Sequence, residues 1–257
     1  MKHYQLISAA ALLAVLAGCP GNVPAGPKPS PTPGATTKPS ATPTAPVIKG
    51  PTQGLVAYYP FEGNANDLSG NGNNGQVAGD VKFVTGMIGK AAEFTSEGNL
   101  SEIMVRHSAS LSPTTALTLS AWTSYNKDFN GGFYPVLTKG KVKEDYTLWA
   151  VEGGLEVLMD WETDNQFWAH SEGDVHAPSQ WHLLTATYDG QKVTYYLDGE
   201  KQNEYPYTAR IDASGEDLYI GTSYPGDVER WHGWIDDLRI YSRALSAQEV
   251  RELHAVK

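Results

Sequence analysis

The stretch WHLLTATYDGQKVTYYLDGE, residues 181–200, has the pattern of two β-strands joined by a tight turn. Threonine, valine, tyrosine and leucine dominate both runs, and these residue types pack well on a pleated surface. Asp189-Gly190 separates the two runs, and Asp198-Gly199 follows the second one. Glycine after aspartate tolerates the positive φ angles that hairpin turns need. The stretch therefore predicts an antiparallel β-hairpin.

Further short apolar runs occur on both sides of this hairpin at close intervals. Such spacing predicts a β-sandwich or barrel. The predicted strands are 55–59, 91–94, 117–125, 146–151, 155–161, 181–188, 192–197, 218–221 and 234–241. One helix is predicted near the C-terminus, because Ser246 and Glu249 have the spacing of a capping box. Val250, Leu253 and Val256 would face the sandwich.

Composition limits the classes of protein that the chain can belong to. With 257 residues, 40% of them hydrophobic, 14 Tyr and 7 Trp, the chain can bury a sizeable core. All 29 acidic residues lie at or after Glu62, where they meet only 15 of the 19 basic residues. This acidic balance argues against nucleic-acid binding and makes a bound cation easier to accept. The single cysteine excludes an intramolecular disulfide and a Cys-based zinc site.

The N-terminus has the pattern of a secretory signal. Lys2 and His3 precede an apolar run, residues 6–17, that is too short to cross a bilayer comfortably. The run ends in Leu16-Ala17-Gly18-Cys19, which resembles the bacterial lipobox. This resemblance implies that residues 1–18 are a signal peptide and that Cys19 carries the lipid that anchors the mature protein to a membrane of the cell envelope. The alternative is an ordinary signal peptide with a chance cysteine.

Residues 19–52 are predicted to be a linker. Ten of the 16 prolines lie between Pro20 and Gln53, among Gly, Ser, Thr and Ala. Proline favours the extended polyproline II conformation, so the segment is expected to act as a semi-rigid spacer. A Pro-rich ligand for a partner domain and a glycosylated stalk are the alternatives. Residues 53–257 then form the folded domain.

Several segments of this domain resemble those of the laminin-G-like, concanavalin A-like jelly-roll family found in bacterial surface proteins. The resemblance extends over residues 54–257 and implies an all-β fold of two antiparallel sheets with one short C-terminal helix. The segments that carry it, in the order of the family, are 54–61 (GLVAYYPF), 67–75 (DLSGNGNNG), 119–122 (LSAW), 181–190 (WHLLTATYDG) and 233–246 (GWIDDLRIYSRALS).

A calcium site is expected between the start of the domain and its last strand. Glu62, Asp67 and the Asn-rich loop that contains Asn71 offer the hard oxygen ligands that calcium takes. Asp236 shares its parity with Leu238 and Ile240, so its carboxylate is expected to point inward and to need a partner, while Asp237 would face outward. In the family that the chain resembles, a calcium ion commonly joins these two regions. This implies Asp67 and Asp236 as principal ligands, with Glu62 and Asn71 as helpers.

The alternative to a calcium site needs no metal. In that case Asp67 caps a turn, and Asp236 accepts hydrogen bonds from main-chain amides.

Aromatic side chains with polar neighbours indicate a carbohydrate-binding site. Trp122, Trp181 and Trp231 occupy positions where the family pattern has core aromatics, and simple packing is expected for them. On strand alternation Trp149 is opposite to Leu148 and should face outward, while Trp168 and His170 share one face of a short strand. The loop that contains Tyr224 adds a further candidate contact. The predicted ligand-binding residues are Trp149, Trp168, His170 and Tyr224, and incidental packing is the alternative for each.

Catalytic motifs are absent from the sequence. Related endoglucanases carry Glu-x-Asp-x-Glu on one strand, and the spacing Glu156, Asp160, Glu162 does not match it. No Gly-x-Ser-x-Gly, His-Glu-x-x-His or P-loop pattern occurs either. We therefore expect a lipid-anchored lectin-like domain that binds carbohydrate without catalysis. A module that binds a cell-envelope protein is the alternative, and a glycoside hydrolase is a minor one.

Overall fold

The computed structural model of the chain describes residues 47–95, 100–126, 134–140, 145–151, 154–159, 167–170, 179–224 and 229–257, with the backbone alone at 151, 154–159 and 167–170. The predicted signal peptide, Cys19, most of the linker, Asp160 to Glu162 and much of the loops that lead to Tyr134 and follow Tyr224 lie outside these residues. Residues 45–257 form one compact unit.

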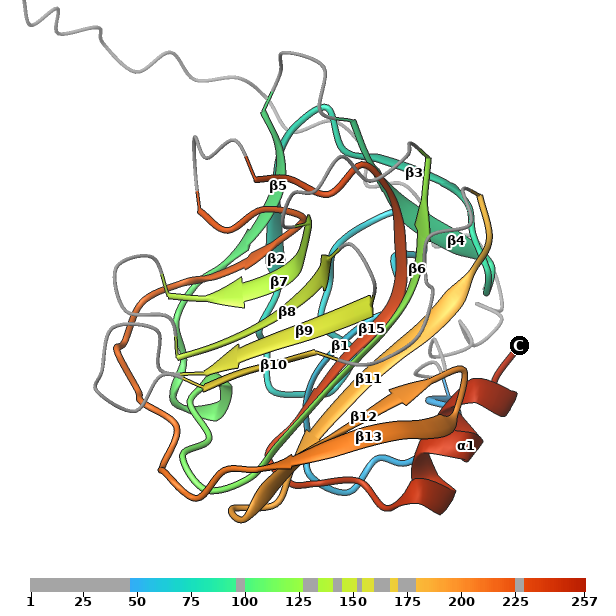
Figure 1. The fold of residues 1–257 in the computed structure, drawn as a ribbon. Helices are drawn as coiled ribbons and strands as arrows, with labels where there is room; N and C mark the ends of the chain where they lie inside the picture. The colour runs from blue at the N-terminus through green and yellow to red at the C-terminus, as the bar shows by residue number, and fades with distance from the viewer. Residues whose placement is uncertain are drawn as a thin grey trace, which may run out of the picture. The chain divides into compact units, whose positions relative to one another are not determined.

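Two antiparallel sheets face one another, as predicted (Figure 1). The first sheet runs in the order β13-β12-β11-β6-β15-β4-β3, and β1 also pairs with β15. Its strands are β1 (Leu55–Tyr59), β3 (Lys82–Thr85), β4 (Lys90–Phe94), β6 (Leu117–Tyr125), β11 (His182–Tyr188), β12 (Lys192–Leu197), β13 (Glu200–Pro206) and β15 (Gly233–Tyr241).

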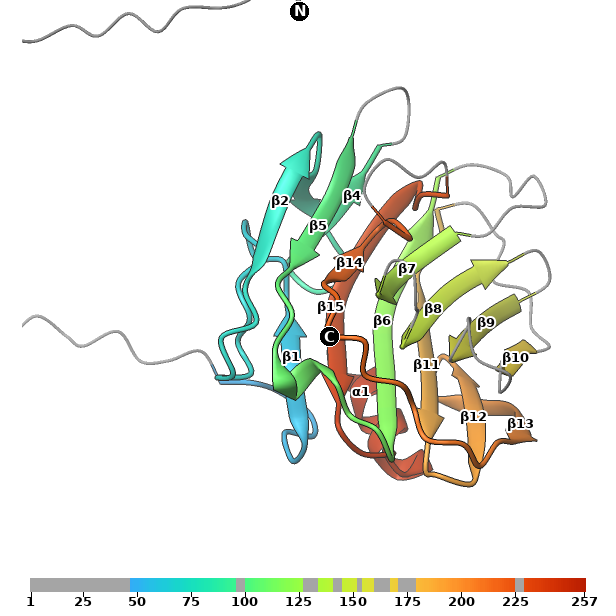
Figure 2. The ribbon, with the colours of Figure 1, turned by 90° about the vertical axis from the view of Figure 1, so that its left-hand side faces the viewer.

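The second sheet runs in the order β10-β9-β8-β7-β14-β5-β2. Figure 2 shows β2 and β5 at one end of it and β9 and β10 at the other. Its strands are β2 (Gly75–Gly79), β5 (Ser101–Val105), β7 (Tyr134–Lys139), β8 (Tyr146–Val151), β9 (Gly154–Met159), β10 (Phe167–His170) and β14 (Leu218–Ile220). A 3-10 turn, Ala109–Leu111, connects β5 to β6.

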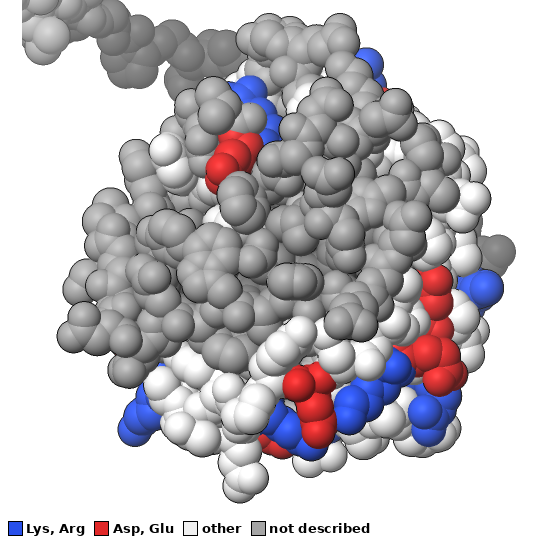
Figure 3. Space-filling view, in the orientation of Figure 1, with Lys and Arg blue, Asp and Glu red and all other residues white. Residues whose placement is uncertain are grey.

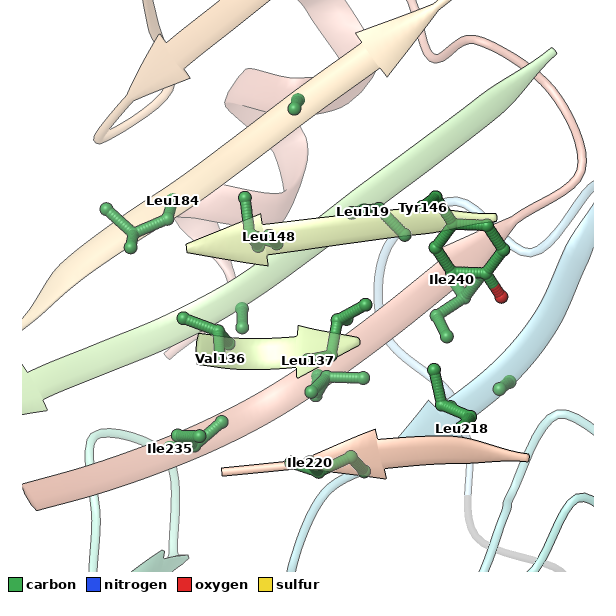
Figure 4. Packing of buried hydrophobic residues seen from close by; sticks show 14 of the residues in the cluster. Leu119, Val136, Leu137, Tyr146, Leu148, Leu184, Leu218, Ile220, Ile235 and Ile240 are labelled. Carbon is green, nitrogen blue, oxygen red and sulfur yellow. The ribbon is translucent and has the colours of Figure 1, made fainter. Parts of the chain in front are cut away.

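The main core lies between the two sheets. Figure 4 shows Leu119, Leu184, Ile235 and Ile240 of the first sheet opposite residues of the second. Across the second sheet, one cross-strand row of this core contains Ile103, Ile220, Leu137 and Leu148. All four are fully buried, so they contribute the apolar burial that drives the sheets together.

A second apolar cluster covers the outer face of the first sheet. Trp122, Leu183 and Tyr241 of the sheet pack with Val250 and Leu253 of α1 (Ala247–Ala255). The helix starts at Ser246, which forms the predicted capping box with Glu249. Val250 and Leu253 are buried as predicted, and Val256 is half-buried. Within the described residues, no helix is both long and apolar enough to pass through a membrane.

The segment before β1 belongs to the folded domain. Ile48 packs against the outer cluster, and the carbonyl oxygens of Lys49 and Pro51 accept hydrogen bonds of 2.7 and 3.0 Å from Arg239 and Tyr241 of β15. The predicted boundary at residue 53 stays a prediction, but residues 49–51 already contact β15, through side chains that come from the far end of the sequence.

Candidate functional site

Asp236 lies on the outer face of the first sheet, in contrast to the prediction that it shares the face of Leu238 and Ile240. The register of β15 against β6 shifts between Asp236 and Arg239, and Asp237 has a positive φ of 45°. This β-bulge inserts one extra residue and reverses the alternation. Asp236 is consequently opposite Trp122 of the outer cluster, while Leu238 and Ile240 point into the main core.

The environment of Asp236 is unusual for a carboxylate. Its side chain is fully buried and accepts main-chain N–H groups from Ile88 at 2.8 Å and from Asp237 at 2.7 Å. Burial raises its pKa to about 7, and the negative charges of Asp237 and Glu62 act in the same direction against the two hydrogen bonds. A carboxylate that is buried near others of its own charge is a group that a cation would stabilise.

Glu62 and Asp236 both lie next to the loop between β3 and β4, at residues 86–90. Its Oε1 accepts the N–H of Lys90 at 3.1 Å, and a side chain at Gly89 would collide with it. At the other end of this loop, a Cβ at Gly86 would come within 2.7 Å of Asp236 Oδ2. The two glycines therefore allow the loop between β3 and β4 to pass close to both carboxylates.

Asp67 and Asn71 form a separate polar turn beside β1. Asp67 Oδ1 accepts the N–H groups of Tyr58 and Ser69, and Oδ2 accepts the N–H of Asn73 and the hydroxyl of Ser69. These four donors occupy the four lone-pair positions of a carboxylate. Asn71 Nδ2 donates to the carbonyl oxygen of Leu55 at 3.1 Å. The hydrogen bonds of Asp67 are those of a turn cap, as in the alternative without a metal.

The four predicted metal ligands thus divide into two groups by the segments they bind: Asp236 and Glu62 accept main-chain N–H groups of residues 88 and 90, whereas Asp67 and Asn71 bind main-chain groups of β1. Within the part of the chain that the structure describes, no group of three or more His, Cys, Asp or Glu side chains is placed to hold a metal ion. Asp237, which was expected to face outward, is buried on the outer side of the sheet and forms an ion pair with Arg239.

Trp149 is buried, in contrast to the prediction of an exposed aromatic platform. Alternation does place Trp149 on the face opposite to Leu148, since Leu148 belongs to the main core and Trp149 does not. Its side chain is nevertheless only 5% exposed, and Nε1 donates to Thr138 Oγ1 at 3.3 Å. Strand alternation predicts which face of the sheet a side chain occupies. Whether other segments of the chain bury that side chain depends on tertiary structure.

The strand register brings three of the predicted ligand-binding residues to one edge of the second sheet. Trp149 of β8 is paired with Glu156 of β9, and Glu156 is paired with His170 of β10. Trp168 lies two residues before His170 on β10, which is the edge strand. Tyr224, the fourth predicted residue, is half-buried beyond the end of β14. The side chains of Glu156, Trp168 and His170 lie outside the described atoms.

Two buried polar residues near the other end of this sheet were not predicted. Glu102 of β5 is 5% exposed, and its Oε2 has no hydrogen-bond partner. Burial raises its pKa, and the positive charge of Arg230 acts in the opposite direction. Tyr219 of β14 is 7% exposed, and burial also raises its pKa, as does the charge of Glu102. The sequence around Glu102 is not predicted as a strand and contains no signal for a site.

On the face of the molecule that Figure 3 shows, the described surface carries Lys and Arg side chains next to Asp and Glu side chains. Glu204 of β13 binds Lys192 at 2.8 Å and Lys201 at 2.7 Å. A surface of this kind lacks the single positive sign that attracts phosphate groups.

The histidine of the WHLL segment closes a turn. His182 Nδ1 lies 2.8 Å from Asp198 Oδ2, and the Leu183 N–H donates to Asp198 Oδ1. Burial acts to raise the pKa of Asp198, but these two hydrogen bonds outweigh it and lower the pKa below its ordinary value. The contacts of Asp198 with His182 and Leu183 stabilise the turn between β12 and β13, in which Asp198 has a φ of 52°.

Residues 97–251 match the sequence profile of the concanavalin A-like lectin/glucanases superfamily. This match includes strands of both sheets and the first half of α1. A comparison with curated proteins found no match.

Three solved structures illustrate the structural likeness. The binding domain of Paraclostridial mosquitocidal protein 1 has a TM-score of 0.66 and 21% identity, over 79% of this chain and 52% of that one. Domain 4 of AbnA, a GH43 extracellular arabinanase from Geobacillus stearothermophilus, was solved in complex with arabinotriose. It has a TM-score of 0.65 and 19% identity, over 80% of this chain and 100% of that one.

The third structure is the binding domain of botulinum neurotoxin DC in complex with rat synaptotagmin II. It has a TM-score of 0.61 and 12% identity, over 80% of this chain and 52% of that one. This chain therefore spans about half of the length of either toxin domain. At such identities the likenesses establish the fold, and function has to be argued from the site.

Proposed function

Because the chain belongs to the concanavalin A-like lectin/glucanases superfamily, we propose that its folded domain is a non-catalytic module that binds carbohydrate at the β8–β10 edge. The observation that carries this proposal is the backbone register, which pairs Glu156 of β9 with His170 of the edge strand β10, two residues after Trp168. Saccharide sites combine aromatic surface with a few convergent hydrogen-bonding groups. Domain 4 of AbnA, which has this fold, was solved with arabinotriose.

The variants Trp168→Ala and His170→Ala test this site. Both residues lie on an edge strand, so we expect the melting temperature to change little. Glycan-array screening of the wild type, with arabinotriose among the probes, identifies a ligand whose affinity is then measured by calorimetry. We expect each variant to weaken binding at least tenfold, and unchanged affinity in both would contradict the proposed site.

A protein partner is the second candidate. It is supported by the complex of the neurotoxin binding domain with synaptotagmin II, which has the same fold. Two results together would favour this alternative. The chain would bind no glycan across a broad array, and it would capture one defined envelope protein, with this capture abolished by Trp168→Ala.

We also propose a calcium site, with Asp236 and Glu62 as its side-chain ligands in place of the four predicted residues. The buried carboxylate of Asp236 and the neighbouring Glu62 fit a cation, since each is an oxygen ligand and their negative charges act on each other. Asp67 does not fit, because its lone-pair positions are occupied. A bound calcium ion would supply positive charge between the loop at residues 86–89 and the last strand, and its role would be structural.

Membrane anchoring through Cys19 is proposed from the lipobox pattern alone. The lipid would hold the domain at the bacterial cell envelope on its proline-rich linker. Membrane partitioning of a Cys19→Ala protein tests this, and partitioning equal to that of the wild type would contradict it.

A further inference from the structure

A row of aromatic and polar residues crosses the outer face of the first sheet, on the opposite side of the sandwich from the β8–β10 edge. Glu93 of β4 is paired with Trp234 of β15, and Trp234 is paired with Ser124 of β6. His182 is opposite Thr123, so Trp181, one residue earlier, comes opposite Ser124. We call Glu93, Trp234, Ser124 and Trp181 the tryptophan row.

The register decides which way this row points. Trp234 precedes Ile235, which is in the main core, and it lies two residues before Asp236, which is opposite Trp122 of the outer cluster. Trp181 lies two residues before Leu183, another member of that cluster, and packs against it. Side chains two residues apart on a strand share a face. The tryptophan row therefore lies on the outer face, next to the surface that α1 covers.

The two tryptophans of the row differ from the core tryptophans in exposure. Trp122 and Trp231 are each 2% exposed, as expected for packing residues, whereas Trp181 and Trp234 are half-buried. The prediction that Trp181 is a simple core residue is thus only partly correct. The two partly exposed indoles lie on one face of the sheet, on either side of β6, and water reaches both of them.

Hydrogen-bonding groups in the row are available to a ligand. Among the described residues, neither indole N–H nor the Glu93 carboxylate makes a hydrogen bond or ion pair, and none of these atoms is both buried and unpaired. Ser124, between the two tryptophans, is buried and does not contribute a contact. Lys82, opposite Glu93 on β3, is exposed. Two N–H donors and a carboxylate acceptor can pair with sugar hydroxyls, each of which both donates and accepts.

The spacing of the row indicates the shape of the ligand. Trp181 directly precedes β11 and Trp234 lies on β15, and β6 lies between these two strands. Neighbouring strands lie about 4.8 Å apart, so the two positions are separated by roughly 10 Å across the sheet. This is close to the length of one disaccharide unit in an extended β-1,4-linked chain, whose pyranose rings have flat faces that stack on indoles. A short or strongly bent glycan would not contact both tryptophans.

We propose that the tryptophan row is a second carbohydrate-binding surface, which takes an extended β-1,4-linked polysaccharide across the strands of the first sheet. The two indoles stack on alternate sugar rings, and Glu93 accepts hydrogen bonds from the hydroxyls. The residues of the tryptophan row all come from the first sheet or directly precede one of its strands. This proposal is therefore independent of the site proposed at β8–β10. Two sites on opposite sheets would let one domain hold two polysaccharide chains.

Affinity electrophoresis of the full chain tests the proposal. The probes are the soluble β-1,4-linked polysaccharides hydroxyethyl cellulose, xylan and glucomannan, with the α-linked glucan dextran as a control. We expect at least one β-1,4-linked probe to retard the wild type, and Trp234→Ala to weaken that binding at least tenfold. Glu93→Gln is expected to weaken it by a smaller factor. Absence of retardation by all three probes would overturn the proposal.

Matched variants separate this surface from the β8–β10 edge and from simple loss of folding. Val77→Ala removes an exposed apolar side chain from β2 of the other sheet, outside both proposed sites, and should leave the binding of the β-1,4-linked probe unchanged. Trp181→Phe, which keeps the apolar contact with the outer cluster, should reduce binding with little change in melting temperature. If Trp234→Ala binds as the wild type does, or if Trp168→Ala abolishes binding of the same probe while Trp234→Ala does not, the row is not the site.

Discussion

The guanidinium of Arg239 donates a 2.7 Å hydrogen bond to the carbonyl oxygen of Lys49, which lies 190 positions earlier in the chain. Arg239 is buried, forms an ion pair with Asp237 and lies with its guanidinium carbon 4.3 Å from the ring centre of Tyr58. One side chain of the last strand therefore holds the first strand, the β-bulge and the segment that leads into the domain.

Removal of residues 47–53 should destabilise the domain. The carbonyl oxygens of Lys49, Pro51 and Gln53 accept hydrogen bonds from Arg239, Tyr241 and Arg243. Each such bond contributes about 1 kcal/mol, and a buried guanidinium that loses an acceptor costs more. We expect a fragment of residues 54–257 to have a free energy of unfolding about 3 kcal/mol lower than one of residues 47–257, measured by urea denaturation. Equal stability of the two fragments would show that the segment is passive.

The sequence predicts the strands in which aliphatic, aromatic and β-branched residues dominate the run. The ranges 55–59, 117–125, 146–151 and 192–197 agree with β1, β6, β8 and β12 to the residue. Strands β2, β3, β5, β7 and β13 were not predicted. The first three have four or five residues and contain glycine, lysine or glutamate, β7 contains a proline, and β13 is largely polar. These strands depend on their neighbours in the sheet more than on local preference.

The face that Asp236 occupies and the tryptophan row both depend on features that lie outside local sequence. Alternation through Asp236 and Leu238 assumed a regular strand, and no glycine marks the bulge because Asp237 itself adopts the left-handed conformation, which aspartate tolerates better than most residues. The tryptophan row could not be read from the sequence, since it needs the pairing of Trp234 with Ser124 across 110 positions.

Calcium should stabilise the wild-type chain through Asp236 and Glu62. A ligand that binds only the folded state adds about 2.7 kcal/mol at a hundred times its dissociation constant. We expect the melting temperature to rise in calcium relative to chelator, and Asp236→Asn and Glu62→Gln to remove most of that rise. Asp67→Ala should lower the melting temperature equally in both conditions, because its carboxylate caps a turn. A wild type with the same melting temperature in calcium and chelator would exclude the site.

The attachment of α1 should weaken in acid. The hydrogen bonds and charge of Arg243 lower the pKa of Glu249 to about 2, against 4.5 for an unperturbed side chain, although burial acts to raise it. A carboxyl whose pKa is lowered on folding contributes stability above its unfolded pKa, and this contribution is lost as pH falls from about 4.5 to 2.

The variant Glu249→Gln isolates this effect, since glutamine preserves the capping-box geometry without the charge. Because the pair is partly exposed, the expected loss is on the order of 1 kcal/mol at pH 7 and near zero at pH 2. Urea denaturation of both proteins at pH 7, 4 and 2 measures the difference. A difference that stays constant over this range would show that the charge of Glu249 plays no part.

Trp149 and Trp168 should separate packing from binding at the second sheet. Trp149 is 5% exposed and hydrogen-bonded to Thr138, so Trp149→Ala leaves a cavity and is expected to cost about 3–5 kcal/mol in the free energy of unfolding. Trp149→Phe retains much of the packing and should cost less, with the unpaired Thr138 hydroxyl as the remaining defect.

Trp168 lies on the edge strand β10, and its replacement by alanine should leave the free energy of unfolding within about 1 kcal/mol of the wild type while it lowers glycan affinity. Urea denaturation and calorimetry on the same preparations give both quantities. A Trp149→Ala protein of wild-type stability and reduced affinity would return Trp149 to the ligand-binding surface.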